Sequence, residues 1–105
     1  MPARTGKEVI DRLKNRPPNL WLEGQLVEDP TSHPRTHNAV RSLAALYDLQ
    51  YRDDLVDIMT VKSPSSGDLV GRSFIVPESK DDLRQRSEMH KVWADASLGH
   101  MGRSP

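Results

Sequence analysis

The sequence predicts an α+β domain that is mainly helical, with about four helices and two β-hairpins. Apolar residues recur at helical spacing in several stretches that begin with capping residues. Two pairs of short apolar runs flank turn-forming sequences, which is typical of hairpins. The 105 residues suit one domain spanning 1–105, and a hydrophobic content of 35% is enough for one small core.

The first predicted helix begins near Thr5. Thr5 and Glu8 have the spacing of a capping box, in which each side chain binds the other residue's backbone N–H. Val9, Ile10 and Leu13 then fall on one side of a short helix. Pro17 and the proline after it end this helix, because proline lacks the N–H that a helix interior needs.

Residues 20–27 predict a tight hairpin. The apolar runs 20–22 and 25–27 lie on either side of Glu23-Gly24, and glycine is common in two-residue hairpin turns. Trp21 in this hairpin and Trp93 in the last helix have aromatic faces on which a ligand could stack. We favour the simpler interpretation, in which both tryptophans anchor the core.

The remaining elements follow from periodicity and turn residues. The apolar residues of 35–50 follow the helical repeat, so this stretch predicts a helix. Asp53-Asp54 can start a further short helix, in which Leu55, Ile58 and Met59 face inward. The turn sequence 63–68 separates the predicted strands 59–61 and 69–76. Ser79 caps the longest helix, which we expect to run to Gly99 with this buried stripe: Leu83, Met89, Val92, Trp93, Ala96.

Charge and composition exclude several classes of function. Fifteen basic and fifteen acidic residues cancel, so no excess charge indicates binding to nucleic acid or to an anionic membrane. The chain has no cysteine, which excludes disulfides, thiolate nucleophiles and cysteine-bound metals. No apolar run approaches the roughly 18 residues that cross a bilayer. We therefore expect a cytoplasmic protein.

Metal binding is the weakest of the candidate chemistries. His33 and His37 are four residues apart and could share one face of a helix, as metal-binding pairs do. Pro34 and the loop before it disturb that geometry, so surface or capping histidines are the better interpretation. We expect no metal site.

The last residues combine two glycines, a histidine and an arginine. Gly99 and Gly102 allow a sharp change of direction after the helix, because glycine adopts positive φ without steric cost. Arg103 then presents a permanent, forked cation, and His100 is a further candidate between the glycines. The alternative is an ordinary helix C-cap followed by a surface arginine, and these residues alone do not exclude it.

The order of motifs along the whole chain resembles the N-terminal region of the 4-hydroxyphenylacetate 3-hydroxylase family. These proteins are the oxygenase components of flavin-dependent aromatic monooxygenases. Each motif alone is weak, but together they cover essentially the whole sequence in matching order. The matching segments are Arg4–Lys7, Trp21–Val27, Thr31–Pro34, Ala44–Leu49, Met59–Thr60, Ser63–Gly67, Val70–Phe74, Ser79–Arg84, Trp93–Ala96 and Met101–Pro105.

The resemblance implies a fold like that of acyl-CoA dehydrogenases, with an N-terminal helical domain, a middle β-barrel and a C-terminal helical bundle. This chain would supply only the first domain, as a piece of a larger oxygenase or a truncated gene product. The complete enzyme would be a homotetramer. It would hydroxylate a phenol such as 4-hydroxyphenylacetate in the ortho position, using FAD reduced by a separate flavin reductase.

The resemblance also implies roles for the last residues. Arg103 would be the catalytic, substrate-binding arginine that holds the phenolic oxygen, while Ser104 and Pro105 would shape the same wall. A fixed cation there would stabilise the negative charge that develops on that oxygen. The family's other phenol contacts, a tyrosine and a histidine, have no counterpart in this sequence. The flavin contacts are expected downstream, so the chain alone should be inactive.

Two alternatives remain. The related 4-hydroxybutyryl-CoA dehydratases bind an iron–sulfur cluster through cysteines, and a chain without cysteine cannot furnish those ligands. A non-catalytic docking module derived from the same domain is the second alternative. It predicts an uncovered apolar patch, drawn from these residues: Leu43, Tyr47, Val92, Trp93.

Overall fold

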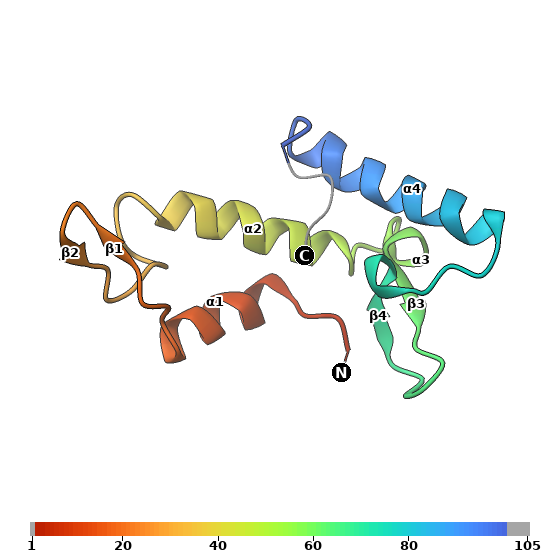
Figure 1. Ribbon diagram of the computed structural model, residues 1–105, viewed down its shortest axis with the longest axis horizontal. Coiled ribbons are helices and arrows are strands. Elements are labelled where there is room, and N and C mark those ends of the chain that lie inside the picture. Colours follow the sequence, from red (N-terminus) through yellow and green to blue (C-terminus); the bar gives the residue numbers. More distant parts are fainter. Residues whose placement is uncertain (1, 101–105) are drawn as a thin grey trace. The chain divides into compact units, whose positions relative to one another are not determined.

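Helices and two small antiparallel sheets make up the protein, of which the computed structural model describes residues 2–100. The elements, in order, are α1 (Gly6–Asn15), β1 (Trp21–Leu22), β2 (Gln25–Leu26), α2 (His37–Leu49), α3 (Val56–Met59), β3 (Thr60–Lys62), β4 (Leu69–Gly71), the 3-10 turn η1 (Arg72–Phe74) and α4 (Lys80–Ala96) (Figure 1). This confirms the predicted mixture of helices and two hairpins. Backbone contacts divide the described residues into two compact units, residues 4–48 and residues 2–3 with 49–100.

In the unit of residues 4–48, α1 begins with the predicted capping box. The Glu8 N–H donates to Thr5 Oγ1 at 3.2 Å, and the Thr5 N–H donates to Glu8 Oε2 at 2.7 Å. The Gly6 N–H donates to Asp48 Oδ1 at 2.7 Å, which ties the start of α1 to the end of α2. A Cβ on Gly6 would lie 2.5 Å from the carbonyl oxygen of Ala44, so only glycine fits this approach.

The first hairpin forms as predicted, but Trp21 does not anchor the core. Trp21 pairs with Leu26 across the strands, and the turn residues Glu23 and Gly24 have φ values of 51° and 78°. Directly opposed residues share one face of a hairpin. Here that face is the outer one, because Trp21 is 58% and Leu26 47% exposed, whereas the next residue, Val27, is buried. The expectation that Trp21 is a core residue was therefore wrong.

α2 begins two residues later than predicted, because the preceding loop makes its own turns. Thr36 Oγ1 donates to the Pro30 carbonyl at 2.6 Å, and the His37 N–H donates to the His33 carbonyl at 2.9 Å. Ala44 is a core residue of α2 in this unit.

In the unit that continues from residue 49, α3 is a short helix, as predicted, but it begins later than Asp53-Asp54. Asp54 does not cap it; its carboxylate instead accepts from Nε of Arg52 at 2.8 Å and from Nη2 at 2.6 Å. The helix therefore starts at Val56 and occupies four residues. Met59 is fully buried at its end, as predicted.

The second hairpin forms, but its second strand is much shorter than predicted. β3 and β4 pair in the register Thr60 to Gly71 and Lys62 to Leu69. Residues 72–76 were expected to continue the strand. The chain instead turns into η1, because the Arg72 side chain folds back onto carbonyl groups of α3 and β3.

α4 starts as predicted, with Ser79 Oγ accepting from the Asp82 N–H at 3.1 Å. Met89 and Trp93 are fully buried, and α4 packs through its inner face against α3 and η1. The prediction was wrong for Leu83, which is 55% exposed, and for Ala96, which is also exposed. Met89 and Trp93 are one turn apart, so they alone define the buried line, and the other two positions fall outside it.

Candidate functional site at the end of α4

The residues predicted to bind the phenol lie outside the described part of the chain. Arg103, Ser104 and Pro105 belong to the segment 101–105, so their assignment stays a prediction. The structure does describe the support from which that segment leaves, namely the last turn of α4 and residues 97–100.

α4 ends three residues before the predicted limit of Gly99. The last helical residue is Ala96, and the N–H of the C-cap residue Ser97 donates to the Trp93 carbonyl at 3.1 Å. The Ser97 hydroxyl donates to the same carbonyl at 2.7 Å. Both bonds satisfy a terminal carbonyl of the helix, and they join it to the fully buried Trp93.

Two consecutive left-handed residues then reverse the chain. Leu98 has φ of 56° and Gly99 has φ of 85°. The Gly99 N–H donates to the Ala94 carbonyl at 2.7 Å, which is the six-residue bond of a Schellman motif. The predicted change of direction at Gly99 is confirmed, and it begins one residue earlier than expected.

Leu98 is the unexpected member of this reversal. A leucine in the left-handed region costs roughly 1–2 kcal/mol relative to the usual helical conformation. Its side chain is 91% exposed, so burial within the described residues does not offset that cost. The hydrogen bond made by Gly99 and the two made by Ser97 hold the strained geometry in place.

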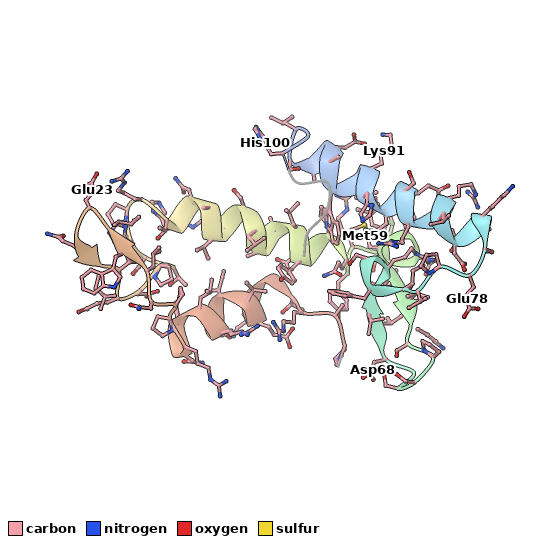
Figure 2. All side chains as sticks on the ribbon, in the orientation of Figure 1. Glu23, Met59, Asp68, Glu78, Lys91 and His100 are labelled. Carbon is pink, nitrogen blue, oxygen red and sulfur yellow. The ribbon has the colours of Figure 1, made fainter. Side chains whose placement is uncertain are left out.

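His100 follows the reversal and is exposed (Figure 2). Its N–H donates to the Ser97 carbonyl at 3.2 Å, so the backbone remains tied to the end of α4 up to this residue. The possibility that His100 contributes to substrate binding stays a prediction.

Arg72 organises the other side of α4, and the sequence analysis missed it. Its Nε donates to the Ile58 carbonyl at 2.9 Å, and Nη2 donates to the carbonyls of Asp57 at 2.8 Å and Thr60 at 3.0 Å. Nη1 donates to Gln85 Oε1 at 2.6 Å. One guanidinium therefore binds the end of α3, the start of β3 and the middle of α4. The sequence signal that could have indicated this role was a charged arginine within the predicted strand 69–76, which is mostly apolar.

Several other described arginines are held by carboxylates. Arg35 pairs with Glu23, Arg52 with Asp54, and Arg84 with both Asp81 and Glu88, all at the surface. These contacts raise the pKa of Arg84, chiefly through the Asp81 hydrogen bond, so it stays charged. Arg72 is likewise committed to protein acceptors. All four of these arginines therefore bind protein groups, and none of them is placed to bind a substrate.

The starts of α1 and α4 do not fit the phosphates of a flavin nucleotide. Its phosphates need backbone N–H groups or cations, typically at the start of a helix. The start of α1 is already bound by Thr5, Glu8 and Asp48. At the start of α4, Ser79 binds the Asp82 N–H, and the Asp82 carboxylate accepts from the Glu78 N–H at 2.9 Å. Carboxylates at both positions would repel a phosphate.

The two histidines considered for a metal make local contacts instead. His33 Nδ1 accepts from the Arg35 N–H at 3.1 Å, and His37 Nδ1 lies 3.0 Å from the His33 carbonyl oxygen. Among residues 2–100, no three His, Asp or Glu side chains gather as a metal site would require. In the same part of the chain, no helix is both long enough and apolar enough to cross a membrane.

The chain belongs to the family described as 4-hydroxyphenylacetate 3-hydroxylase N terminal, whose profile matches residues 5–105. The 4-hydroxyphenylacetate 3-monooxygenase oxygenase component of Thermus thermophilus is 50% identical over 98% of this chain. The corresponding component of Geobacillus sp. strain PA-9 is 48% identical over 100%. The chain spans only 21% of the length of either relative.

The similarity to solved structures agrees with this family membership. The crystal structure of a 4-hydroxyphenylacetate 3-monooxygenase oxygenase component complexed with FAD and 4-hydroxyphenylacetate superposes with a TM-score of 0.91. It is 50% identical, and the match covers 98% of this chain and 21% of that one. An archaeal 4-hydroxybutyryl-CoA dehydratase from N. maritimus is more distant, with a TM-score of 0.73 and 28% identity over 88% of this chain and 18% of its own. The dehydratase alternative is therefore not favoured.

The docking-module alternative predicted an uncovered apolar patch, and one of its four candidate residues is excluded. Trp93 is fully buried, and the other three, Leu43, Tyr47 and Val92, are half-buried. The most exposed large apolar side chains in the described residues are instead Leu98, Val76 and Phe74.

Proposed function

We propose that this polypeptide is the N-terminal part of a longer, reduced-flavin-dependent monooxygenase that hydroxylates a phenol ortho to its hydroxyl group. The observation that carries the proposal is the 50% identity, over nearly the whole chain, to an oxygenase component solved with FAD and 4-hydroxyphenylacetate. The substrate would be 4-hydroxyphenylacetate or a close relative of it.

In this proposal Arg103 holds the phenolic oxygen. The reversal at Leu98 and Gly99 supports it, because two left-handed residues and three hydrogen bonds fix the direction in which the chain leaves α4. A guanidinium carried by this support would donate to the phenolic oxygen and favour its ionised form, since a nearby cation lowers the pKa of a phenol. An electron-rich ring is the form that accepts an electrophilic oxygen. Ser104 and Pro105 would form the adjoining wall.

The rest of the longer protein would supply what these residues lack. FAD, reduced by a separate reductase, would provide the oxygen-transfer chemistry from a site built outside residues 2–100. The complete protein would have an acyl-CoA-dehydrogenase-like fold, in which residues 1–105 form the N-terminal domain, and would assemble as a cytoplasmic homotetramer. On its own, the 105-residue chain would not hydroxylate phenols.

A chimaera tests this assignment. Residues 1–105 would replace the matching fifth of the Thermus thermophilus oxygenase component, and hydroxylation of 4-hydroxyphenylacetate would be measured with reduced FAD and oxygen. We expect activity from the chimaera and none from residues 1–105 alone. Arg103→Ala in the chimaera should lower kcat/KM by about 100-fold or more, the usual effect of losing a donor at a developing oxyanion.

The affinity for FAD separates a phenol-binding role from a general defect. It should be unchanged in Arg103→Ala, and Lys91→Ala, on the exposed side of α4, serves as the control with full activity. Weaker FAD binding with normal phenol turnover would show that Arg103 has a different role.

A further inference from the structure

The end of η1 and the residues that follow it expose two large apolar side chains. Phe74 is 73% and Val76 is 82% exposed. Ile75, between them, has extended backbone angles, with φ of −67° and ψ of 147°, and is half-buried. Phe74 is the last residue of η1, and only Ile75 separates it from Val76, so the two exposed apolar side chains are close together along the chain. We call these two residues the apolar edge.

The apolar edge is held in place by the surrounding structure. Arg72, at the start of η1, is fixed by its hydrogen bonds to α3, β3 and α4, and the Ile75 N–H donates to the Arg72 carbonyl at 3.2 Å. A Cβ on Gly71 would lie 3.5 Å from the Phe74 ring, so that ring covers the glycine. On the other side of the edge, the N–H of Glu78, which Figure 2 labels, donates to the Asp82 carboxylate of α4 at 2.9 Å. The edge is therefore preformed.

The backbone of the edge is poorly suited to strand pairing. In the described part of the chain, no backbone hydrogen bond joins Val76 to another residue. Pro77, which follows, has no N–H to donate. Pro77 disfavours the addition of a strand here, so another segment would pack on this edge chiefly through the exposed apolar side chains.

We propose that the apolar edge is a docking surface for the polypeptide that follows residue 105 in the longer protein. The inference rests on the proposed function in that it requires that longer protein. The relatives are about five times as long as this chain, which spans 21% of their length. In such a longer protein, residues 2–100 would have a large, covalently attached partner against which an exposed face can pack.

The edge alone is too small to hold a second copy of residues 1–105, which favours an attached partner. A fully buried phenylalanine removes only about 150–250 Å² from water, whereas a stable complex buries about 800 Å² on each partner. A segment of the same polypeptide needs no such area, because its effective concentration is already high.

Two matched substitutions test the proposal by thermal stability. Val76→Lys places a charge on the edge, and Ser87→Lys places the same charge at an exposed position of α4. Neither should change the melting temperature of residues 1–105 alone. In the chimaera, Val76→Lys should lower it by about 2 °C or more, and Ser87→Lys should not. Equal melting temperatures for the two variants in the longer protein would overturn the proposal.

Residue-resolved hydroxyl-radical footprinting supplies a second, mutation-free readout. Phe74 should be oxidised rapidly in residues 1–105 and be protected in the longer protein, while the fully buried Trp93 stays protected in both. Equal oxidation of Phe74 in the two proteins would overturn the proposal. Concentration-dependent protection of Phe74 in residues 1–105, with a dimer in sedimentation, would assign the edge to a second copy and also overturn it. Neither readout uses hydroxylation, so the docking surface and the proposed function can fail separately.

Discussion

Nη1 of Arg72 lies 2.6 Å from Oε1 of Gln85, which joins the turn after β4 to the middle of α4. Three further hydrogen bonds from the same guanidinium reach the carbonyls of Ile58, Asp57 and Thr60. These contacts make Arg72 a cross-link between α4 and the end of α3.

We expect Arg72→Ala to lower the free energy of unfolding by about 3 kcal/mol, because it leaves several carbonyl groups without their charged donor. Arg72→Lys should recover little of this loss, since an ammonium group cannot reach the same forked set of acceptors. Urea unfolding of residues 1–105 measures both. Arg84→Ala, which removes only exposed ion pairs, should leave stability nearly unchanged. Equal losses for Arg72→Ala and Arg84→Ala would contradict this role.

Because Leu98 has a positive φ, we expect its replacement by glycine to stabilise the protein, although glycine usually destabilises. Leu98→Gly should raise the free energy of unfolding by about 1 kcal/mol, because glycine adopts φ of 56° without strain and the leucine side chain is exposed. Leu83→Gly, also at an exposed leucine but within α4, should lower it by about 1 kcal/mol. Urea titrations of the two variants should therefore move in opposite directions. A loss of stability in both would show that Leu98 is not strained.

The two tryptophans should differ sharply when truncated. Trp93 is fully buried, so Trp93→Ala should cost about 3–5 kcal/mol and could unfold the domain outright. Trp21→Ala should cost less than about 1 kcal/mol, because most of the ring already contacts solvent. Circular dichroism during urea unfolding measures both changes, and Trp93→Phe provides a milder variant that keeps the domain folded. Similar costs at the two positions would contradict the burial of Trp93.

The lowered pKa of Asp29 predicts that the stability of the fold depends on pH. Its pKa is lowered, chiefly because Thr31 Oγ1 donates to Oδ1 at 2.6 Å and then because the Thr31 N–H donates at 2.9 Å. A lowered folded-state pKa stabilises the fold above the ordinary carboxyl range, and this contribution disappears as pH falls through the lowered value. Thr31→Val should raise the Asp29 pKa in an NMR titration and reduce the loss of stability in acid. Ser32→Ala should have a smaller effect, since Ser32 contributes less.

Local signals at the starts of α1 and α4 were sufficient to predict these two helices. The Thr5 and Glu8 pair and the Ser79 cap each act through hydrogen bonds within a few residues, so the sequence contains both partners. The Glu23-Gly24 turn is equally local. Burial was predicted less well. Trp21 and Leu83 look like core residues, but exposure depends on which face the rest of the fold covers, and no short-range pattern records that.

Long-range polar contacts could not be predicted from the sequence either. Arg72 interrupts an apolar run that otherwise predicts a strand, and only its partners on α3, β3 and α4 explain why the chain turns there. The candidate site divides in the same way. The reversal at Gly99 follows from glycine itself and was predicted, whereas the role proposed for Arg103 would depend on a substrate and on partners that no local pattern records.

The reversal after α4 also sets a limit on protein engineering. The Gly99 N–H reaches back five residues to Ala94, so one added residue between Ser97 and Gly99 would break that bond and send the following chain in another direction. Linkers or fusions should therefore not be inserted there. The exposed hairpin turn at residues 64–67, whose ends are held by β3 and β4, is the safer place for a tag or label.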